Sequence, residues 1–453
     1  QRGYVDASVN RAELRDVDNP LVDLLILGTE GSPVLTGQII VRGNELTQDK
    51  VIRRQVDLQP DRLLDATAIV RTEQRLRDLN LFAAEREGRP APKATIQPAD
   101  DENPGYRDVL VEIEEKNTGS LQFGAALSSD SGVIGQVGLT QRNFDLYDTP
   151  DSFGEFITGR AFRGAGQTFS IQLQPGTETQ HHSLGPVEPF SLEPNYALSA
   201  PRVYSSRTFD QYEEQRLGGN ASVGRNFGTV WSGVLAVRAE NIDIKGIAFL
   251  APTEIRAAEG AHSIFGFGSK LVRNTLDSRF RPTRGSRLEL SLERVEGSFS
   301  FTKLGTEYLV YVPVFEDYLG RKPSRSLRTR ADWIPEGTDN GPVFERYYQG
   351  GRGFRGFAFR GVSPRGPQPT GLPFPNDFRV SDDPVGGTWS FFVGPEIEQP
   401  LIGKIISVVG FVDTGTVTRS LGFQSYRVAA GLGLRLYITA LSPAPLAFDF
   451  GFP

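Results

Sequence analysis

The sequence predicts a small α+β domain followed by an all-β, antiparallel sheet that closes as a transmembrane barrel. Three observations predict this order. Segment 62–81 repeats apolar residues at helical spacing, and from Gly119 onward apolar and polar residues alternate with a period of two. The chain holds no run of about eighteen apolar residues, which excludes a membrane protein built from helices.

The composition narrows the classes further. A net charge of -6 over 453 residues is too acidic for a general nucleic-acid binder, so no nucleic-acid partner is expected. The 50 glycines and 30 phenylalanines favour an all-β protein, and a barrel hides its spans from hydropathy averages. The absence of cysteine suits an oxidising envelope compartment. Because the chain begins at Gln1 without an initiator Met or a signal peptide, we expect it to be a fragment.

The N-terminal quarter predicts one complete α+β domain preceded by part of another. The first two strands are joined by an Asp18-Asn19-Pro20 turn and lack the rest of a domain. A short helix is expected to begin with a Thr47 cap. The expected elements are, in order, strands 4–16, 21–29 and 37–44, helices 47–56 and 62–81, and strands 94–97 and 107–116.

About fifteen alternating segments follow, many of the roughly ten residues that a tilted membrane strand requires. The pattern alone also fits a soluble sandwich, but a sandwich rarely uses so many long strands. The expected strands lie near 119–128, 133–143, 166–174, 179–189, 194–207, 213–226, 229–242, 262–275, 284–295, 298–314, 322–333, 388–401, 404–415, 424–438 and 443–452.

A glycine-rich stretch at 344–366, FERYYQGGRGFRGFAFRGVSPRG, is expected to be a long loop that folds back onto the rest of the protein. Gly351, Gly353 and Gly356 satisfy G-x-G-x-x-G. A dinucleotide site would need a strand before this motif and a helix after it, whereas more Gly and Pro follow. A disordered RNA-binding tract is equally disfavoured, because the stretch lies deep inside a patterned, acidic chain.

Several motifs together resemble the BamA-type outer-membrane protein insertases. The N-terminal domain resembles a POTRA domain in its Gly43-Asn44 turn, Thr47 and VIRR (51–54), and in the run that ends at Phe82. The barrel half carries, in family order, GVIG (132–135), QRNF (141–144), Asp277-x-Arg279 with Pro282 and Gly285, FRGF (354–357), Phe411-x-Asp413-x-Gly415, GLGLRL (431–436) and PLAFDFGFP (445–453).

The resemblance implies a domain plan. Residues 1–33 would be the C-terminal part of a preceding POTRA domain and 34–117 the complete last POTRA domain. Residues 118–453 would form an outer-membrane barrel, with an inward Arg-Gly-Phe loop at about 334–387. Family barrels have sixteen strands, with this loop between strands eleven and twelve, so one strand more than the fifteen segments here is expected.

The loop motif implies a docking site. A guanidinium in a confined lumen needs an anionic partner, and the carboxylate of Asp413 is expected to pair with Arg355. Glu396, in the family's E-x-x-x-P pattern, is expected to supply a second carboxylate. Phe357 and Phe411 would pack beside the pair, and Gly356 would let the loop backbone approach the wall. The chain departs from the family in carrying Phe354 before Arg-Gly-Phe and in a gap after Gly350-Gly351 that is one residue short.

By this resemblance, the protein folds and inserts nascent outer-membrane barrel proteins in a diderm bacterium, with its POTRA domains in the periplasm. Its partners would be those clients, the lipid bilayer, periplasmic chaperones and accessory lipoproteins; no cofactor and no metal are implied. The first barrel strand would meet the last at a weak seam that pairs with client strands. The seam residues expected on strand 119–128 are Leu121, Phe123, Gly124, Ala125 and Leu127.

Two other function classes, a translocation pore and an enzyme, share individual features with this sequence. A translocation pore of the two-partner secretion or TamA type shares the loop motif. An enzyme is disfavoured, because Ser222 in NASVG lacks the first Gly of G-x-S-x-G, and His181, His182 and His262 offer neither ligand spacing nor a catalytic triad.

Overall fold

A computed structural model describes most of the chain, and in it the chain divides into two compact units. Unit 1 comprises Gln1–Ser120, Thr140–Phe169 and Glu188–Pro194, and unit 2 comprises Leu121–Leu139, Ser170–Val187 and Asn195–Pro453. The structure describes residues 3–15, 22–85, 88–98, 103–189, 196–278, 281–313, 323–369, 378–403, 405–438 and 445–453. The expected Asp18-Asn19-Pro20 turn lies outside these ranges.

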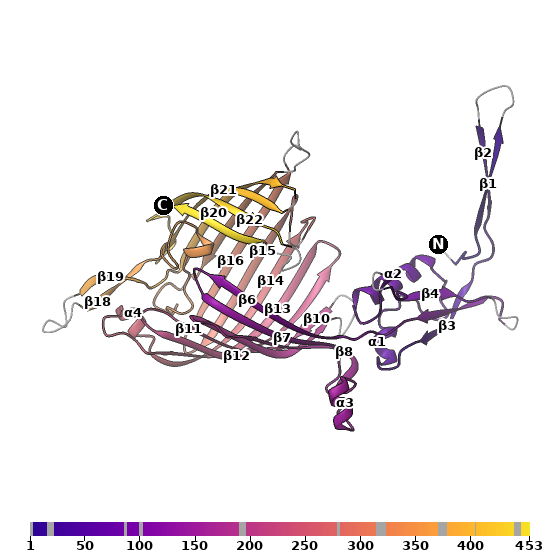
Figure 1. Ribbon diagram of the computed structural model, residues 1–453, viewed down its shortest axis with the longest axis horizontal. Helices are drawn as coiled ribbons and strands as arrows, with labels where there is room; N and C mark the ends of the chain where they lie inside the picture. Colours follow the sequence, from indigo (N-terminus) through magenta and orange to yellow (C-terminus); the bar gives the residue numbers. More distant parts are fainter. Residues whose placement is uncertain are drawn as a thin grey trace. The chain divides into compact units, whose positions relative to one another are not determined.

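Unit 1 contains the expected α+β domain in the expected order of strand, helix, helix, strand, strand (Figure 1). Its three strands form a sheet in the order β3-β5-β4, in which β3 is parallel and β4 antiparallel to β5. The elements are β3 (Leu35–Arg42), α1 (Asp49–Arg53), α2 (Ala66–Asp78), β4 (Lys93–Ile96) and β5 (Tyr106–Glu112). Among the described residues, no helix is long and apolar enough to cross a membrane.

The core of this domain lies between the helices and the sheet. Fully buried apolar residues from both helices and from β5 form one cluster, including Ile52, Leu76 and Val109. Helix α2 is shorter than the expected 62–81 because Asp65 caps it, accepting a hydrogen bond from the Thr67 backbone N–H at 2.9 Å. The apolar spacing therefore predicted the buried face, and the cap decided where the helix begins.

Helix α1 is also shorter than expected, and the predicted Thr47 cap is wrong. Residue Gln48 is the N-cap and makes no side-chain capping bond. The Thr47 hydroxyl instead accepts a hydrogen bond from the side-chain amide of Asn143 at 2.9 Å. Asn143 belongs to the QRNF motif, is 2% exposed and also accepts from the backbone N–H of Gly166 at 2.9 Å. Asn143, which is distant in sequence, thus bonds to the Thr47 hydroxyl that the local pattern predicted would cap the helix.

A further antiparallel hairpin precedes this domain. It consists of β1 (Ser8–Arg15) and β2 (Val22–Thr29), paired from Ser8↔Thr29 to Arg15↔Val22. Unit 1 also contains α3 (Phe153–Thr158), which lies between β7 and β8.

The long alternating region forms one large antiparallel sheet (Figure 1). Its order is β23-β22-β21-β20-β17-β16-β15-β14-β13-β12-β10-β9-β8-β7-β6, with β11 beside β12 and β9. The strands are β6 (Gly119–Ser128), β7 (Gly132–Phe144), β8 (Arg163–Gln174), β9 (Thr179–Pro189), β10 (Tyr196–Ser199), β11 (Arg202–Thr208), β12 (Glu213–Phe227), β13 (Trp231–Lys245), β14 (Gly260–Asn274), β15 (Gly285–Gly297), β16 (Phe301–Pro313), β17 (Ser324–Trp333), β20 (Trp389–Ile402), β21 (Ile406–Thr418), β22 (Arg427–Leu436) and β23 (Leu446–Phe452).

The strand count follows from the register on β12. The sheet is 16-stranded by pairing, but β10 and β11 continue in one register, with Tyr196↔Arg225 in the first and Thr208↔Glu213 in the second. They are two parts of one strand, separated at Pro201, which has no N–H to donate to a ladder. Among the described residues, this sheet therefore has fifteen strands, as the alternating segments predicted.

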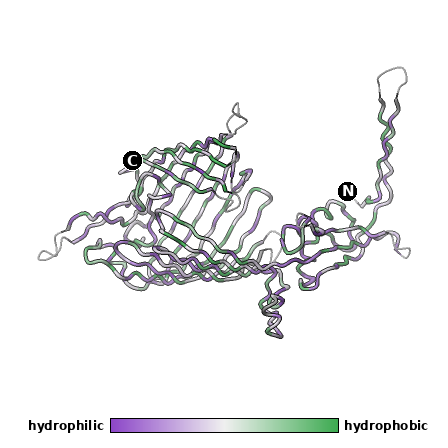
Figure 2. Tube along the Cα trace, in the orientation of Figure 1, coloured by the Kyte–Doolittle hydropathy of each residue, from purple (hydrophilic) through white to green (hydrophobic). Residues whose placement is uncertain are grey.

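The alternation along each strand separates an apolar face from a polar one, and Figure 2 shows hydrophobic and hydrophilic residues interspersed along the sheet. On β13, Leu235 and Val237 are 67% and 46% exposed on one face, whereas Arg238 and Glu240 on the other face form ion pairs. The polar face is the one that the long connection between β17 and β20 contacts. Strands β6 and β23 are the two ends of the sheet.

Candidate functional site: the Arg355 loop

The candidate site lies on the connection between β17 and β20, residues 334–388. It contains the short helix η2 (Gly351–Gly353) and a hairpin of β18 (Arg365–Pro369) and β19 (Phe378–Pro384). Backbone hydrogen bonds fold the segment onto itself, from Gly351 N–H to Phe357 C=O at 2.9 Å and from Val362 N–H to Gln349 C=O at 3.0 Å. The glycines that excluded a regular element therefore build a compact loop.

Arg355 is held by two carboxylates on neighbouring strands. Its Nε and Nη2 donate to the two oxygens of Asp413 on β21, at 2.9 and 2.8 Å, and its backbone N–H donates to Asp413 at 2.8 Å. Its Nη1 donates to Glu396 on β20 at 2.6 Å. Asp413 is only 1% exposed, so the pair is largely withdrawn from solvent. Such a two-pronged contact is the strongest geometry available to a guanidinium and a carboxylate.

The acidic contacts continue onto the last two strands. Arg435 on β22 donates to Asp449 on β23 at 2.6 Å, and Asp449 lies 3.9 Å from Nη1 of Arg355. A polar cavity of about 360 Å³ borders this network and is lined by Arg355, Glu396, Asp413, Arg435 and Asp449 among others. Charges from four adjacent strands therefore converge on the loop.

Two expected aromatics occupy different places. The Arg355 guanidinium lies 3.5 Å from the ring centre of Phe411, a cation–π contact. Phe357 instead packs edge-on against Phe354, with ring centres 5.1 Å apart. Phe354, the departure from the family pattern, is fully buried and also contacts Phe392 on β20 at 5.6 Å. The large residue before Arg-Gly-Phe thus supplies the loop with its own apolar contact to the wall.

Gly356 brings the loop backbone against the last strands. It has φ +91°, and a Cβ at this position would lie 2.8 Å from the Ala429 Cβ and 3.2 Å from the backbone of Gly451. No other residue fits there without moving the loop or the strand. Gly356 thus has the close approach that the sequence predicted.

The loop also reaches the other end of the sheet, which the sequence did not predict. The Arg352 backbone N–H donates to the carboxylate of Asp130, in the turn between β6 and β7, at 2.8 Å. Gly351 has φ +60°, and a Cβ there would collide with the same carboxylate. Since extended chain spans about 3.4 Å per residue, the five steps from Gly351 to Gly356 bridge at most about 17 Å. The two ends of the sheet therefore lie close together at this level.

The expected seam residues all lie on β6, one end of the sheet. The large apolar side chains among them are exposed on this strand: Leu121 is 59%, Phe123 74% and Leu127 83% exposed. In the part of the chain that the structure describes, β6 pairs with β7 alone and β23 with β22 alone. Among these residues each end strand has one partner, and the role of β6 in a seam stays a prediction.

The weaker enzymatic candidates have structural contacts. Ser222 lies in the ladder between β12 and β13, opposite Ala236. His182 stacks on Tyr204 with ring centres 5.9 Å apart, and the His262 ring contacts Phe299 and Phe344. No group of three or more possible metal ligands occurs within the described ranges.

Family comparison places both halves of the chain. Residues 161–453 match the Omp85 superfamily domain, and residues 34–116 match POTRA, the surface antigen variable number repeat. The chain belongs to the Omp85 superfamily. It is accordingly an outer-membrane protein whose POTRA domain faces the periplasm.

Known relatives of this Omp85 protein agree with that placement. The outer membrane protein assembly factor BamA of Nitratidesulfovibrio vulgaris is 24% identical over 464 residues, covering 100% of this chain and 52% of the relative. BamA of Neorickettsia risticii is 22% identical over 394 residues, covering 84% and 47%. The chain thus spans about half the length of these curated relatives.

Solved structures show the same fold. BamA from Haemophilus ducreyi lacking POTRA domains 1–3 superposes with a TM-score of 0.80 at 19% identity, covering 100% of this Omp85 chain and 87% of that one. CdiB from Acinetobacter baumannii gives a TM-score of 0.53 at 14% identity, covering 100% and 78%.

Proposed function

We propose that this Omp85 protein is an outer-membrane β-barrel assembly factor, an insertase that folds nascent barrel proteins into the membrane. The observation that carries the proposal is the loop of Arg355, which pairs with Asp413 and Glu396 and also contacts Asp130 beside β6, at the other end of the sheet. The curated relatives named as assembly factors support it. The proposed clients are unfolded outer-membrane barrel proteins.

The mechanism follows from the free edge of β6. An unpaired strand edge exposes N–H and C=O groups that another strand satisfies by β-augmentation, so β6 would template the first client strand. The loop holds the wall of β20–β23 in place while the seam flexes. Domain 34–117 would guide extended clients by the same pairing, along β3 or β4, the outer strands of its sheet.

The proposed domain plan is the one that the sequence predicted. Residues 1–33 belong to a preceding POTRA domain, 34–117 to the last POTRA domain and 118–453 to the barrel with its loop at about 334–387. Periplasmic chaperones and accessory lipoproteins would deliver clients to the POTRA side. The assembly reaction would exchange backbone hydrogen bonds only and would use no covalent chemistry, so we propose that the protein is not an enzyme.

A translocation pore is the second candidate, because a CdiB structure shares the fold. The higher TM-score with BamA, 0.80 against 0.53, favours the assembly factor. Depletion of the protein in its own cells, followed by a census of outer-membrane proteins, separates the two. An assembly factor predicts the loss of many barrel proteins. Loss of one exported protein, with barrel proteins unchanged, would identify a translocation pore.

A further inference from the structure

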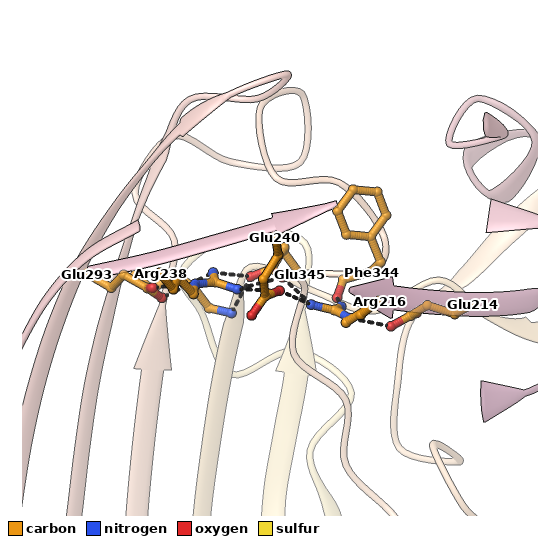
Figure 3. A network of polar contacts seen from close by, with 8 residues as sticks. Glu214, Arg216, Arg238, Glu240, Glu293, Phe344 and Glu345 are labelled. Atoms are coloured by element: carbon orange, nitrogen blue, oxygen red, sulfur yellow. Dashed lines mark hydrogen bonds and ion pairs between the residues drawn. The ribbon is translucent and has the colours of Figure 1, made fainter. Parts of the chain in front are cut away.

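A buried carboxylate lies ten residues before Arg355 in the same loop. Glu345 is 3% exposed and is surrounded by cations from three strands of the sheet (Figure 3). It accepts from Arg216 on β12 at 2.8 Å, from Arg238 on β13 at 3.0 Å and from Lys303 on β16 at 3.0 Å. Arg216 also donates to the Phe344 backbone carbonyl at 2.6 Å.

The surrounding charges show which contact depends on Glu345. Figure 3 shows acidic side chains flanking both arginines: Arg216 pairs with Glu214 at 2.6 Å, and Arg238 with Glu293 at 2.6 Å. Each arginine therefore keeps a carboxylate if Glu345 is removed. For Lys303, Glu345 is the carboxylate at ion-pairing distance within the described ranges. A substitution of Lys303 therefore tests the contact with Glu345 most specifically.

Glu345 is charged despite its burial. Burial opposes its ionisation, but Lys303, Arg216 and Arg238 outweigh that effect and hold the pKa of Glu345 well below its ordinary value. Glu345 lies in the loop, outside the strands. An ionised group so deeply buried stays stable only while its partners remain in place, so the loop cannot move away from this wall without separating the charges.

Glu345 and Arg355 carry opposite charges, and each pairs with side chains of the opposite charge on the sheet. Glu345 contacts basic residues of β12, β13 and β16, whereas Arg355 contacts acidic residues of β20 and β21. Reversing the loop, or sliding it along the wall, would bring like charges together, which is unfavourable where solvent is excluded.

We propose that Glu345 is a further anchor of the loop, and that its charge, opposite to that of Arg355, fixes the orientation and register in which the loop docks. Glu345 is a positioning residue: it acts by placing the segment 345–355, and through it Arg355, on the wall. This proposal rests on the proposed function only in giving the docked loop a role in client insertion.

Loop docking can be measured directly because the chain contains no cysteine. Ser363→Cys would place the only thiol in the loop, at a position that is 9% exposed and whose hydroxyl makes no hydrogen bond among the described residues. The rate at which a maleimide reagent labels this thiol in the full-length protein, in detergent or liposomes, reports how often the loop leaves the wall. No client is present, so the result does not depend on the proposed function.

Glu345→Gln, which keeps the size but removes the charge, is expected to raise the labelling rate at least tenfold. Asp339→Asn is the matched control: it makes the same charge change at an exposed position of the same loop and should label at the parent rate. Lys303→Gln added to Glu345→Gln should raise the rate by less than the product of the single effects, because both changes remove the same contact.

A second pair of variants covers the case in which Glu345→Gln yields no folded barrel. Lys303→Arg keeps the charge and should label at the parent rate, whereas Lys303→Gln should label several times faster. Parent-rate labelling of Glu345→Gln, or of Lys303→Gln where Glu345→Gln does not fold, would overturn the proposal. So would equal acceleration by Asp339→Asn.

A separate readout tests the link to function. Cells that depend on Glu345→Gln should contain fewer folded outer-membrane barrel proteins than cells with Asp339→Asn. If labelling rises but barrel proteins stay at the parent level, Glu345 anchors the loop and the proposed function fails. If labelling stays at the parent rate, the anchor fails whatever the cells contain.

Discussion

Replacing Arg355 by alanine removes four contacts at once and is the sharpest perturbation of the loop. The guanidinium makes two bonds to Asp413, one to Glu396 and a cation–π contact with Phe411. Its loss leaves Asp413, 1% exposed, without its cation. Breaking a buried pair in this way costs about 3–5 kcal/mol. Since about 1.4 kcal/mol is tenfold in an equilibrium constant, the equilibrium constant for docking should fall by roughly a hundredfold to a few thousandfold.

Thiol labelling at Ser363→Cys measures how often the loop leaves the sheet. Resistance of the folded barrel to unfolding in SDS measures the stability of the barrel. Arg355→Lys keeps the charge but not the two parallel bonds, so it should fall between the parent and Arg355→Ala. Combining Arg355→Asp with Asp413→Arg should restore part of the docking, because the ion pair is rebuilt with its charges exchanged. The restoration stays partial because the bond from the residue 355 backbone N–H to the Asp413 carboxylate is lost in the exchange. Parent-like labelling of Arg355→Ala, or no recovery in the exchanged pair, would refute the pairing as the source of docking.

Three further predictions concern single residues. Gly356→Ala should weaken docking by about 1–3 kcal/mol, because its φ is +91° and the neighbouring strands leave no space for a side chain. Gly353 has open space around it, so the control Gly353→Ala should leave thiol labelling at the parent rate. Equal labelling of the two variants would contradict this. Asp65→Ala should destabilise the 34–117 domain by about 1 kcal/mol at pH 7. Hydrogen bonds from Thr67 lower the pKa of Asp65. The contribution of Asp65 to the stability of the domain is therefore present above the ordinary pKa of about 4 and is lost as the pH falls through the lowered value. Thermal melts at pH 7 and at successively lower pH should show the stability difference between variant and parent shrinking. Asp277 accepts hydrogen bonds within the β14–β15 turn, and these lower its pKa to about 2, so it is ionised at pH 7. Asp277→Ala removes these bonds and should increase proteolytic cutting of this turn several-fold at pH 7. An unchanged cutting rate would contradict a structural role of Asp277 in the turn.

The main contact of the site was predicted from the family resemblance, in which the Arg-Gly-Phe loop folds inward. The chemistry agrees with that prediction, because a guanidinium withdrawn from solvent needs a carboxylate partner. The structure brings Arg355 and Asp413 together with Glu396 and Phe411. Phe357 was expected beside the pair, but it packs edge-on against Phe354, which is fully buried.

The other loop contacts were not predictable from pattern. Alternation fixes which face of a strand Arg216, Arg238 and Lys303 lie on, but not which loop residue meets them, because that depends on how far the loop reaches across the sheet. The only sequence signal was that Glu345 is the one acidic residue, among five arginines, in the glycine-rich stretch 344–366. The contact between Asp130 and the loop backbone left no signal, since a backbone N–H is the same in every residue but proline.

Local signals were overridden where a distant residue competed for the same group. Thr47 has the composition of a helix cap, yet its hydroxyl bonds to Asn143, 96 residues away. Asp65 lies within the expected helix 62–81 and caps the observed helix, which therefore begins at Ala66 instead of residue 62. Helical and strand periodicity therefore predicted faces and order reliably, and hydrogen-bond partners decided the ends.

The central claim is that clients pair with the free edge of β6, and disulfide capture tests it most directly. A single cysteine at Phe123 of β6, 74% exposed, is compared with one at Leu235 of β13, 67% exposed and in the middle of the sheet. A barrel client with a cysteine in its terminal strand is arrested during insertion and oxidised. Adducts are expected with Phe123→Cys and none with Leu235→Cys. Equal adducts at both positions, or none at Phe123→Cys while insertion proceeds, would contradict it.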